Sequence, residues 1–274
     1  MTTGAAAGSP EPPAHPIHHL EEVMGTIVTI DVYAAGVTDA GLGVLHEQLA
    51  RARAILHHAD EIFSTWQPHS PVSRLRRGEI SLSQAPPEVA EVLERCAAAR
   101  ELSGGWFDPW AMPGGVDPTG YVKGWAAQNA LAAFSGGTAC GAIVNAAGDI
   151  ASSGGLGRGQ PFRIGITDPA SPLRLAEIVE LTGAIATSGT YERGSHLIDP
   201  HSGRAVARAA SASVTGPDLG LADALATALA VAGEPGLALI EPLGGYEALV
   251  IGFDGSRRWT AGFPFAPRPA ASPR

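Results

Sequence analysis

Long segments with helical periodicity alternate with blocks of short β-rich segments, and this order restricts the chain to a mixed fold. In the first long segment, apolar residues recur at three- and four-residue intervals, as at Leu42, Leu45 and Leu49, which is the spacing of one helix face. Helices are predicted over about 38–63, 87–102, 123–134 and 219–232. Strands are predicted at 26–33, 142–145, 162–167, 175–181, 184–187, 246–252 and 257–261. Hairpin-spaced strands in blocks between helices favour an α+β fold with mainly antiparallel sheets and packed helices.

The two ends of the chain differ in composition from the part between them. Residues 1–19 are mostly Ala, Gly, Ser, Pro and His, and residues 265–274 are rich in Pro and Ala. Such segments cannot bury enough apolar surface to offset the entropy that they lose on ordering. We therefore expect a disordered leader at 1–19, a single domain at 20–264 and a disordered tail at 265–274. Three histidines of the leader are expected to be solvated: His15, His18 and His19.

The charge balance is acidic and argues against a nucleic-acid role. The 274 residues carry 27 Asp and Glu against 18 Lys and Arg, which gives a net charge of -9. No local basic stripe is present that could follow a phosphate backbone. The single lysine among the 18 basic residues is Lys123, in the segment Asp117-Pro-Thr-Gly-Tyr-Val-Lys-Gly124. Composition alone does not say whether this lysine is accidental or selected.

The cysteines and the first residues of the chain bear on the cellular compartment in which the protein is expected. Cys96 and Cys140 are far apart and match neither a zinc nor a redox spacing, which is typical of reduced, buried thiols. The first basic residue is Arg51, so the preceding segment lacks the positive start of a secretory signal. No apolar run approaches the ~18 residues that a membrane span requires. We therefore expect a cytoplasmic protein without a membrane span.

The segment Ala222-Asp-Ala-Leu-Ala-Thr-Ala228 has the chemistry of a cation site. On a helix, Asp223 and Thr227 lie four residues apart and project from one face among small Ala side chains. A carboxylate and a hydroxyl supply the oxygen ligands that Mg²⁺ prefers, and two such side chains suffice for a metal shared with a phosphorylated ligand. An acidic residue near a helix start also stabilises the helix dipole. This segment alone leaves both interpretations open.

Further polar residues follow apolar runs next to glycines. Asn145-Ala-Ala-Gly-Asp149 comes after a predicted strand, where a turn either exposes backbone groups to a ligand or is an ordinary junction. Neither a P-loop nor a dinucleotide fingerprint is present. Downstream, His196 has the chemistry of a general base near neutral pH, but no nucleophile elbow accompanies it, which argues against a serine hydrolase. Asp199-Pro-His-Ser-Gly203 equally fits a turn with a side-chain cap.

Aromatic residues are sparse but cluster beside Gly, Pro and Asp. Trp106-Phe-Asp-Pro-Trp110 and Phe63-Ser-Thr-Trp66 are the main groups, and Trp125 follows Gly124. Core packing is the ordinary role of such side chains. Trp in this setting also provides a stacking surface for a flat heterocycle.

Taken in order, a set of short segments spanning about residues 23–252 carries a resemblance to a known family. The set comprises 24–26, 63–66, 73–75, 105–108, 117–124, 144–149, 162–166, 186–189, 196–200 and 222–227. Single segments are weak signals, but the ordered set is highly specific. It resembles the FAD:protein FMN transferases, also called ApbE-type flavin transferases.

The resemblance implies a fold, an activity and a set of site residues. The implied fold is ApbE- or T-fold-like, with two lobes enclosing a flavin-nucleotide cleft. The implied activity splits FAD at its pyrophosphate, joins FMN to a Thr or Ser hydroxyl of a target flavoprotein, and releases AMP. The family's FAD contacts correspond to Met24, Trp66, Trp106, Phe107, Asp108, Asp117, Lys123 and Leu197. Its metal ligands correspond to the Gly120 carbonyl, Asp223 and Thr227, and its catalytic base corresponds to His196.

The bound Mg²⁺ that the family implies would neutralise charge developing on the pyrophosphate. The sequence departs from many relatives in having Trp66 in place of Tyr and a short connection between Phe107 and Asp117. Ala226 stands where some relatives have an acidic residue. Two other functions fit the same motifs: a Mg²⁺-dependent FAD pyrophosphatase that releases FMN and AMP, and a non-catalytic FAD-binding protein.

Overall fold

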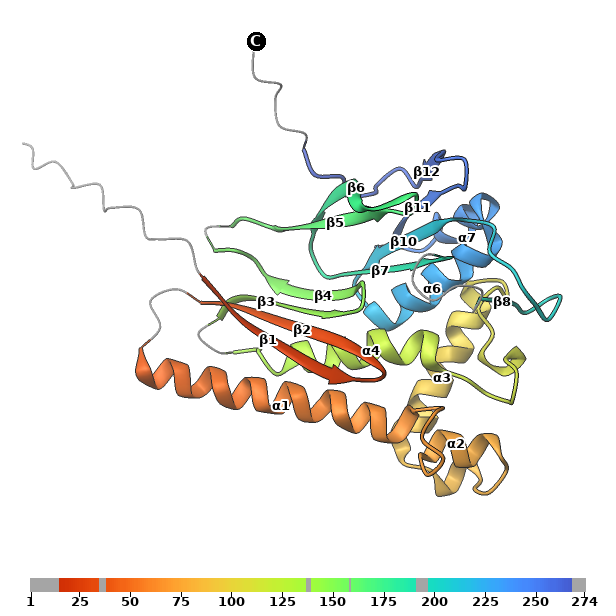
Figure 1. Ribbon diagram of the computed structural model, residues 1–274, viewed down its shortest axis with the longest axis horizontal. Coiled ribbons are helices and arrows are strands. Elements are labelled where there is room, and N and C mark those ends of the chain that lie inside the picture. The colour runs from red at the N-terminus through yellow and green to blue at the C-terminus, as the bar shows by residue number, and fades with distance from the viewer. Residues whose placement is uncertain (1–14, 35–37, 137–138, 158, 191–196, 268–274) are drawn as a thin grey trace, which may run out of the picture.

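The sheet at the centre of the protein has eight strands, and every neighbouring pair in it is antiparallel (Figure 1). The computed structural model describes residues 15–34, 38–136, 139–157, 159–190 and 197–267. In spatial order the strands are β1 (His15–Val23), β2 (Thr26–Ala34), β3 (Ala139–Ala146), β4 (Asp149–Gly154), β7 (Ala184–Gly189), β10 (Ser211–Gly216), β11 (Glu247–Ile251) and β12 (Arg257–Trp259). The prediction of an α+β fold with mainly antiparallel sheet is confirmed.

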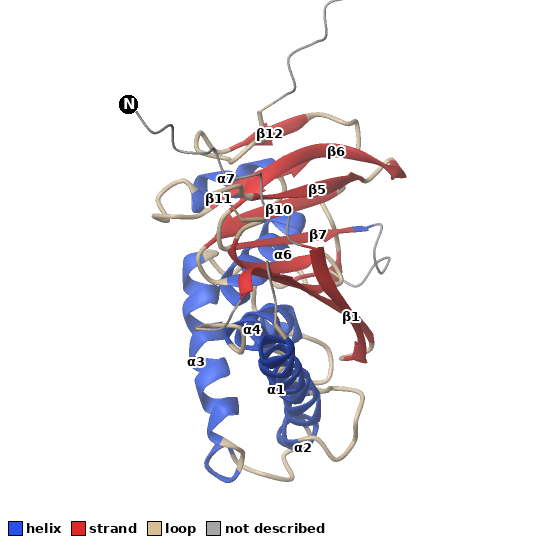
Figure 2. Cartoon of the chain, turned by 90° about the vertical axis from the view of Figure 1, so that its left-hand side faces the viewer, coloured by secondary structure: helices blue, strands red, loops and turns tan. Residues whose placement is uncertain are grey.

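Helices cover one face of this sheet and a β-hairpin covers the other (Figures 1 and 2). The helices on the first face are α1 (Asp39–Phe63), α4 (Thr119–Ala132) and α6 (Leu219–Ala232). The hairpin consists of β5 (Phe162–Asp168) and β6 (Ser171–Leu181). The remaining elements are α2 (Pro71–Arg76), α3 (Pro87–Leu102), α7 (Leu237–Ile240), the short strands β8 (Ile198–Asp199) and β9 (Arg204–Ala205), and 3-10 turns at Leu82–Gln84, Pro109–Ala111 and Glu234–Gly236. Within the described ranges, no helix combines the length and apolarity needed to cross a membrane.

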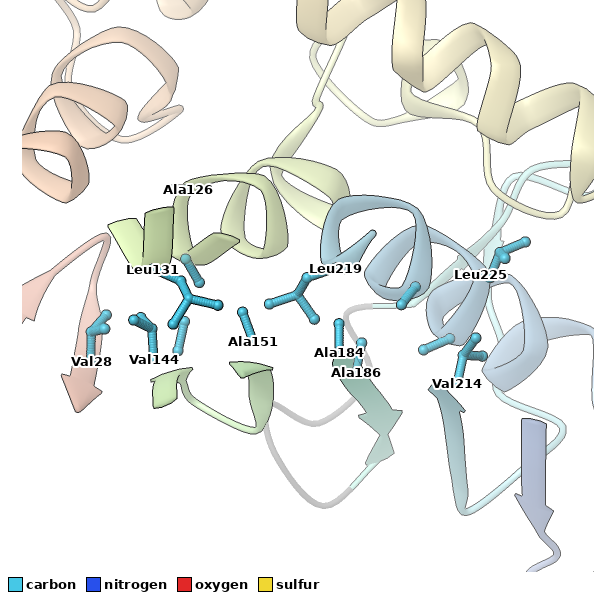
Figure 3. Packing of buried hydrophobic residues seen from close by; sticks show 14 of the residues in the cluster. Val28, Ala126, Leu131, Val144, Ala151, Ala184, Ala186, Val214, Leu219 and Leu225 are labelled. Atoms are coloured by element: carbon cyan, nitrogen blue, oxygen red, sulfur yellow. The ribbon is translucent and has the colours of Figure 1, made fainter. Parts of the chain in front are cut away.

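Alternation along the strands explains these layers, because successive side chains of a strand point to opposite faces. On β7, Ala184 and Ala186 belong to the core beneath the helices, whereas Ile185 belongs to the core beneath the hairpin. Small side chains line the helix side along several strands, as Figure 3 shows for Ala151, Ala184 and Ala186. The helices can therefore lie close to the sheet. Twelve of the 14 residues of α6 are buried, and Leu221 and Thr227 are the two that are partly exposed.

Most predicted helices have the predicted bounds, but α4 begins earlier than expected. The prediction placed its start near Lys123, whereas the helix begins at Thr119. The cause lies in the two residues before it: the Asp117 carboxylate accepts the amide of Thr119 (3.1 Å), and Pro118 has no amide proton that would need a partner at a helix start. Lys123 consequently lies in the second turn of α4.

The predicted boundaries of the domain are wrong at both ends. Residues 15–19 are not a disordered leader, because they pair with β2 as the first half of the edge strand β1. His18 and His19 are not simply solvated: their rings contact the carboxylates of Asp31 and Glu21. At the other end, the ring of Phe265 packs against Phe263 with a centroid distance of 4.9 Å. Ionic and aromatic contacts thus provide the ordering that composition did not suggest.

A cluster around Glu21 fixes strand β1 to helix α1. The Glu21 carboxylate is paired with the Arg53 guanidinium and contacts the rings of His19 (2.8 Å) and His57 (2.7 Å). The Arg53 hydrogen bond, followed by those of His19 and His57, lowers the pKa of Glu21 to about 2. The carboxylate is therefore ionised over most of the accessible pH range.

Glu21→Gln is expected to remove a pH-dependent part of the stability. A carboxylate whose pKa is lower in the folded state contributes stability that is fully present above pH ~4.5 and is lost as the pH falls towards about 2. Because Arg53 and His57 are half exposed, solvent screening keeps this contribution near ~1 kcal/mol. Urea unfolding across this pH range measures the free energy of unfolding. The difference in this free energy between wild type and variant should disappear as the pH falls. The exposed neighbour Glu22 provides the control Glu22→Gln, and a gap that does not depend on pH would contradict the assignment.

Candidate functional site

Two tight turns lie at the same end of the sheet and carry two of the segments identified in the sequence. Met24 and Gly25 connect β1 to β2, and Ala147 and Gly148 connect β3 to β4. The turns share one end of the sheet because Val28 of β2 pairs with Ala146 of β3. All four turn residues have positive φ, from 52° to 94°, as hairpin turns with two left-handed residues require.

Met24 and Ala147 are the non-glycine residues with positive φ in the described ranges. A left-handed conformation costs a residue with a Cβ on the order of 1 kcal/mol, and such strain often occurs at functional sites. The predicted FAD contact Met24 is thus held in an unusual conformation by its hairpin. Its side chain packs against the core beneath the helices.

Strand β7 ends beside these turns, and a buried carboxylate joins it to helix α4. Asp149 is the first residue of β4 and has no exposed surface. One of its carboxylate oxygens accepts the amide of Thr187 (3.2 Å), and the other forms an ion pair with the ammonium of Lys123. The Thr187 hydroxyl lies 2.8 Å from that of Ser213 on β10. Lys123, predicted to contact FAD, is therefore anchored to the end of the sheet.

The three predicted metal ligands converge where α4 and α6 touch. The amide of Gly124 donates to the Asp223 carboxylate (3.3 Å), and within a helix the same amide points at the carbonyl four residues earlier, that of Gly120. The oxygens of Gly120 and Asp223 therefore face one N–H group. A methyl group placed at Gly120 would lie 3.6 Å from the Thr227 hydroxyl. The structure thus brings these residues of the two helices together.

This set of oxygen atoms suits a hard cation. A carboxylate, a hydroxyl and a backbone carbonyl are the donor types that Mg²⁺ accepts, with its other positions left for water and phosphate. In the described part of the chain, His, Cys, Asp and Glu side chains form no group of three that could hold a metal. Besides the Asp223 carboxylate, a cation here would therefore need the Gly120 carbonyl, the Thr227 hydroxyl and a bound ligand. Ala226 is completely buried in the core between α6 and the sheet.

Cys96 is a buried thiol near Asp223. Burial raises the pKa of the nearby Cys96 thiol to about 12, and the charges of Asp223 and Asp117 add to this effect. The thiol is therefore protonated and unreactive, as predicted for a reduced, buried cysteine. Cys140, the other free cysteine, is half-buried and its thiol lies 3.2 Å from the Tyr33 carbonyl.

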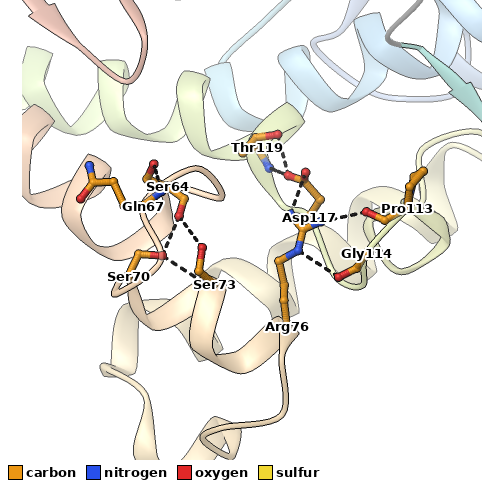
Figure 4. A network of polar contacts seen from close by, with 9 residues as sticks. All are labelled: Ser64, Gln67, Ser70, Ser73, Arg76, Pro113, Gly114, Asp117 and Thr119. Carbon is orange, nitrogen blue, oxygen red and sulfur yellow. Dashed lines mark hydrogen bonds and ion pairs between the residues drawn. The ribbon is translucent and has the colours of Figure 1, made fainter.

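Asp117 is fixed from two sides (Figure 4). One of its oxygens accepts the hydroxyl of Thr119 (2.6 Å), and the other lies 3.2 Å from the guanidinium of Arg76. Arg76 also donates to the carbonyls of Pro113 (2.8 Å) and Gly114 (3.2 Å). The short connection between Phe107 and Asp117 is therefore held against the end of α2 by a single arginine.

A serine network orders the loop that carries Trp66 (Figure 4). The hydroxyls of Ser70 and Ser73 both donate to the carbonyl of Ser64, at 2.6 and 3.0 Å. Ser70 also caps α2 by accepting the amide of Ser73 (3.0 Å). Trp66 itself is 92% exposed. An almost fully exposed tryptophan on an ordered loop is a candidate stacking surface, since side chains of this size are usually largely buried.

The Trp106 ring contacts two other side chains. Its ring meets the His201 ring edge-on at a centroid distance of 4.5 Å, and the Arg208 guanidinium lies 5.1 Å from its centre. Arg208 donates to Asp199 (3.1 Å), which also accepts the amide of His201 (2.9 Å). Burial raises the pKa of Asp199, but these hydrogen bonds outweigh it and the net shift is downward. The segment from Asp199 is thus a capped turn.

Three predicted FAD contacts and the predicted base remain. Phe107 is buried, and its ring lies 3.3 Å from a methyl group placed at Gly120, so it borders the metal-ligand group. Asp108 is paired with Arg100 (2.6 Å) and caps the turn at Pro109–Ala111. Leu197 is buried in the core beneath the helices. His196, the predicted base, lies outside the described residues.

Three residues that contact predicted site residues were not predicted themselves: Asp149 contacts Lys123, Arg76 contacts Asp117, and Ser188 contacts Thr227. The Ser188 hydroxyl lies 3.2 Å from that of Thr227. The sequence signals for Asp149 and Ser188 were their place in polar, glycine-containing segments and in the segments 144–149 and 186–189 of the family resemblance. A surface hollow lined by Arg208, Phe253 and Arg258, among others, lies beside the turn between β11 and β12, and it shares Arg208 with the Trp106 contacts.

Comparison with known proteins gives a consistent result. The sequence profile of one family, described as the ApbE family, matches residues 24–114 and 110–250. A curated protein of Rhodobacter capsulatus named FAD:protein FMN transferase is 37% identical over 134 residues, which are 43% of this chain. The match spans 24% of the length of that relative.

Solved structures share the fold over nearly the whole chain. Flavin Transferase ApbE from Vibrio cholerae superposes with a TM-score of 0.77 at 23% identity, covering 92% of this chain and 99% of its own. The apo form of Pseudomonas stutzeri flavinyl transferase ApbE gives 0.75 at 23% identity, covering 92% and 98%. The apbe protein from Thermotoga maritima gives 0.73 at 21% identity, covering 90% and 98%.

Proposed function

Because the chain belongs to the ApbE family, we propose that it transfers the FMN part of FAD to a Thr or Ser hydroxyl of a target flavoprotein and releases AMP. The observation that best supports this is the convergence of the Gly120, Asp223 and Thr227 oxygens between α4 and α6. An all-oxygen group of this kind suits Mg²⁺ shared with a pyrophosphate. The name of the Rhodobacter capsulatus relative supports FAD as the donor.

The proposed reaction is a single phosphoryl transfer. The acceptor hydroxyl oxygen bonds to the phosphorus on the FMN side of the pyrophosphate, and the bond from that phosphorus to the bridging oxygen breaks. The bridging oxygen leaves with AMP, and the hydroxyl proton passes to His196, the proposed base. Mg²⁺, held by Gly120, Asp223 and Thr227, would supply charge neutralisation at the phosphates. No electron transfer is needed.

The other side chains of the site bind and orient the donor in this proposal. Lys123 presents a compact positive charge from the second turn of α4, towards the phosphates. Phe107 borders the metal-ligand group. Trp66 offers its exposed ring for stacking on a flat part of FAD. Asp117, locked by Arg76 and Thr119, presents a fixed carboxylate at the start of α4.

The proposal is tested by incubating the full chain with FAD, Mg²⁺ and a flavoprotein domain that carries a surface Thr. A fluorescent protein band that survives denaturation, with the mass of the domain raised by an esterified FMN, is the expected result. Release of free FMN and AMP without a covalent product would identify a pyrophosphatase. FAD that stays intact and bound with Mg²⁺ present would identify a binding protein. Either of these two outcomes contradicts the proposed transfer.

Trp66→Ala is expected to weaken FAD binding about tenfold, since stacking of an aromatic side chain on a base contributes on the order of 1–3 kcal/mol. The Tm should stay unchanged, because the side chain is 92% exposed. Fluorescence titration of FAD measures the effect. Phe253→Ala is the matched control, because this ring is also exposed, at 66%, and lies beside the turn between β11 and β12. Equal FAD affinity in both variants would remove Trp66 from the site.

A further inference from the structure

Asp149 has no role in the reaction as proposed above, and burying its charge costs free energy of folding. It has no exposed surface, and an ionised group in such a place needs both a counter-charge and hydrogen bonds. It has both: the Lys123 ammonium on one oxygen and the Thr187 amide on the other. Replacing such a pair with apolar side chains is often neutral or stabilising, so stability alone is a weak reason for its presence.

Two residues that contact Asp149 are chain neighbours of residues that contact the proposed metal ligands. Lys123 lies on α4, one residue before Gly124, whose amide contacts Asp223. Thr187 precedes Ser188, whose hydroxyl lies 3.2 Å from that of Thr227. A hydroxyl that binds a cation through its oxygen must direct its proton elsewhere, and the Ser188 oxygen can accept it. Asp149 therefore connects to both sides of the group, through the α4 backbone and through the end of β7.

We propose that Asp149 is a positioning residue of the flavin-transfer site: it holds the Lys123 ammonium and the end of β7, and so sets Ser188 against Thr227. This inference rests on the proposed function. It assigns no contact between Asp149 and FAD. Asp149 holds the Lys123 ammonium in a fixed place and partly compensates its charge before FAD binds. Asp149 should therefore contribute more to the turnover rate than to the affinity for FAD.

The discriminating variant is Asp149→Asn, which keeps an oxygen for the Thr187 amide and removes the charge that holds Lys123. At a temperature well below the Tm of the variant, we expect kcat for FMN transfer to fall about 10- to 100-fold, as for other residues that orient a metal ligand. The KM for FAD should not rise, since an ammonium that no longer faces the Asp149 charge attracts the pyrophosphate at least as well. A weaker Mg²⁺ response of bound FAD fluorescence gives a second readout that does not depend on turnover.

A second variant separates positioning from stability. Asp149→Asn removes the charge that faces the partly buried Lys123 ammonium and should lower the Tm. Lys123→Met combined with Asp149→Asn removes both charges and should recover most of that loss. Recovery of the Tm in the double variant would assign the stability loss of Asp149→Asn to the unbalanced charge, so that its kcat and Mg²⁺ response report on positioning. Glu247→Gln is the matched control, because Glu247 also accepts a backbone amide, that of Gly262 (3.0 Å), and starts strand β11. It should lower the Tm and leave kcat and the Mg²⁺ response unchanged.

The outcomes for the inference and for the proposed function are distinct. If wild-type protein transfers no FMN, the proposed function fails. If wild type transfers FMN and Asp149→Asn keeps its kcat and Mg²⁺ response, the inference alone is overturned. It is equally overturned if the loss of kcat follows only the fraction of unfolded protein.

Discussion

Asp223→Ala is expected to lower the rate of FMN transfer at least about 100-fold, which corresponds to ~2.7 kcal/mol of transition-state stabilisation. The reason is that Asp223 is the only side-chain carboxylate in the proposed metal group with Gly120 and Thr227. Binding of FAD in the absence of Mg²⁺ should change little, because the stacking surfaces are untouched. Initial rates at saturating FAD, with a calorimetric Mg²⁺ titration of the FAD complex, measure both effects.

The control for this experiment lies on the same helix. Asp218 caps α6 by accepting the amide of Leu221 (2.8 Å), so Asp218→Ala should cost about 1 kcal/mol of folding stability and leave the transfer rate unchanged. A rate for Asp223→Ala within a few-fold of wild type would remove this carboxylate from the metal site. Equal rate losses in both variants would indicate damage to α6 in place of a lost ligand.

Gly124→Ala is expected to destabilise the protein by about 3 kcal/mol, the upper part of the range for overpacked cores. A methyl group at this position would meet the α6 backbone, with the Leu219 carbonyl carbon at 2.8 Å and the Gly220 nitrogen at 3.0 Å. Backbone atoms cannot rotate away as a side chain can, so α4 and α6 must separate. For a chain of this size the Tm should fall by roughly 6–12 °C. Differential scanning calorimetry measures the shift.

A glycine elsewhere provides the matched comparison. Gly43 lies in α1, and a methyl group placed there would meet nothing within 4 Å. Gly43→Ala should therefore stabilise the protein by up to ~1 kcal/mol, since alanine loses less backbone entropy in a helix. Opposite signs for the two substitutions would locate the effect at the helix contact. A neutral result at Gly124 would mean that the two helices can move apart without cost.

Helices could be predicted from local signals alone where both ends are marked. The helix over 87–102 begins after Pro86 and ends at Ser103 before two glycines, and the structure has the same bounds. Strand β10 was missed although Ala212 and Val214 alternate with polar residues, because most side chains of Ser211–Gly216 are small and Ala and Gly are depleted in strands. Strand β1 was missed because its ordering depends on ion pairs with residues remote in the sequence.

The same distinction applies to the candidate site. The four-residue spacing of Asp223 and Thr227 predicts that they share one face of a helix. The ordered motifs predicted the ApbE family, which the comparisons confirm. The ion pair of Asp149 with Lys123 could not be predicted, because it depends on where β4 and α4 meet in the folded chain. The individual FAD and metal contacts remain predictions.

The burial of α6 has a consequence for how this scaffold can diversify. A helix with 12 of 14 residues buried cannot shift or tilt without disturbing the core on several sides. The oxygen atoms that it presents are therefore fixed in advance and need no ordering when a ligand arrives, which favours catalysis. In the proposed function, new acceptor proteins would have to be accommodated by exposed segments outside the FAD contacts, such as the turn between β11 and β12 with Phe253, where substitutions cost little stability. The chemistry and the choice of partner would thus be free to change independently.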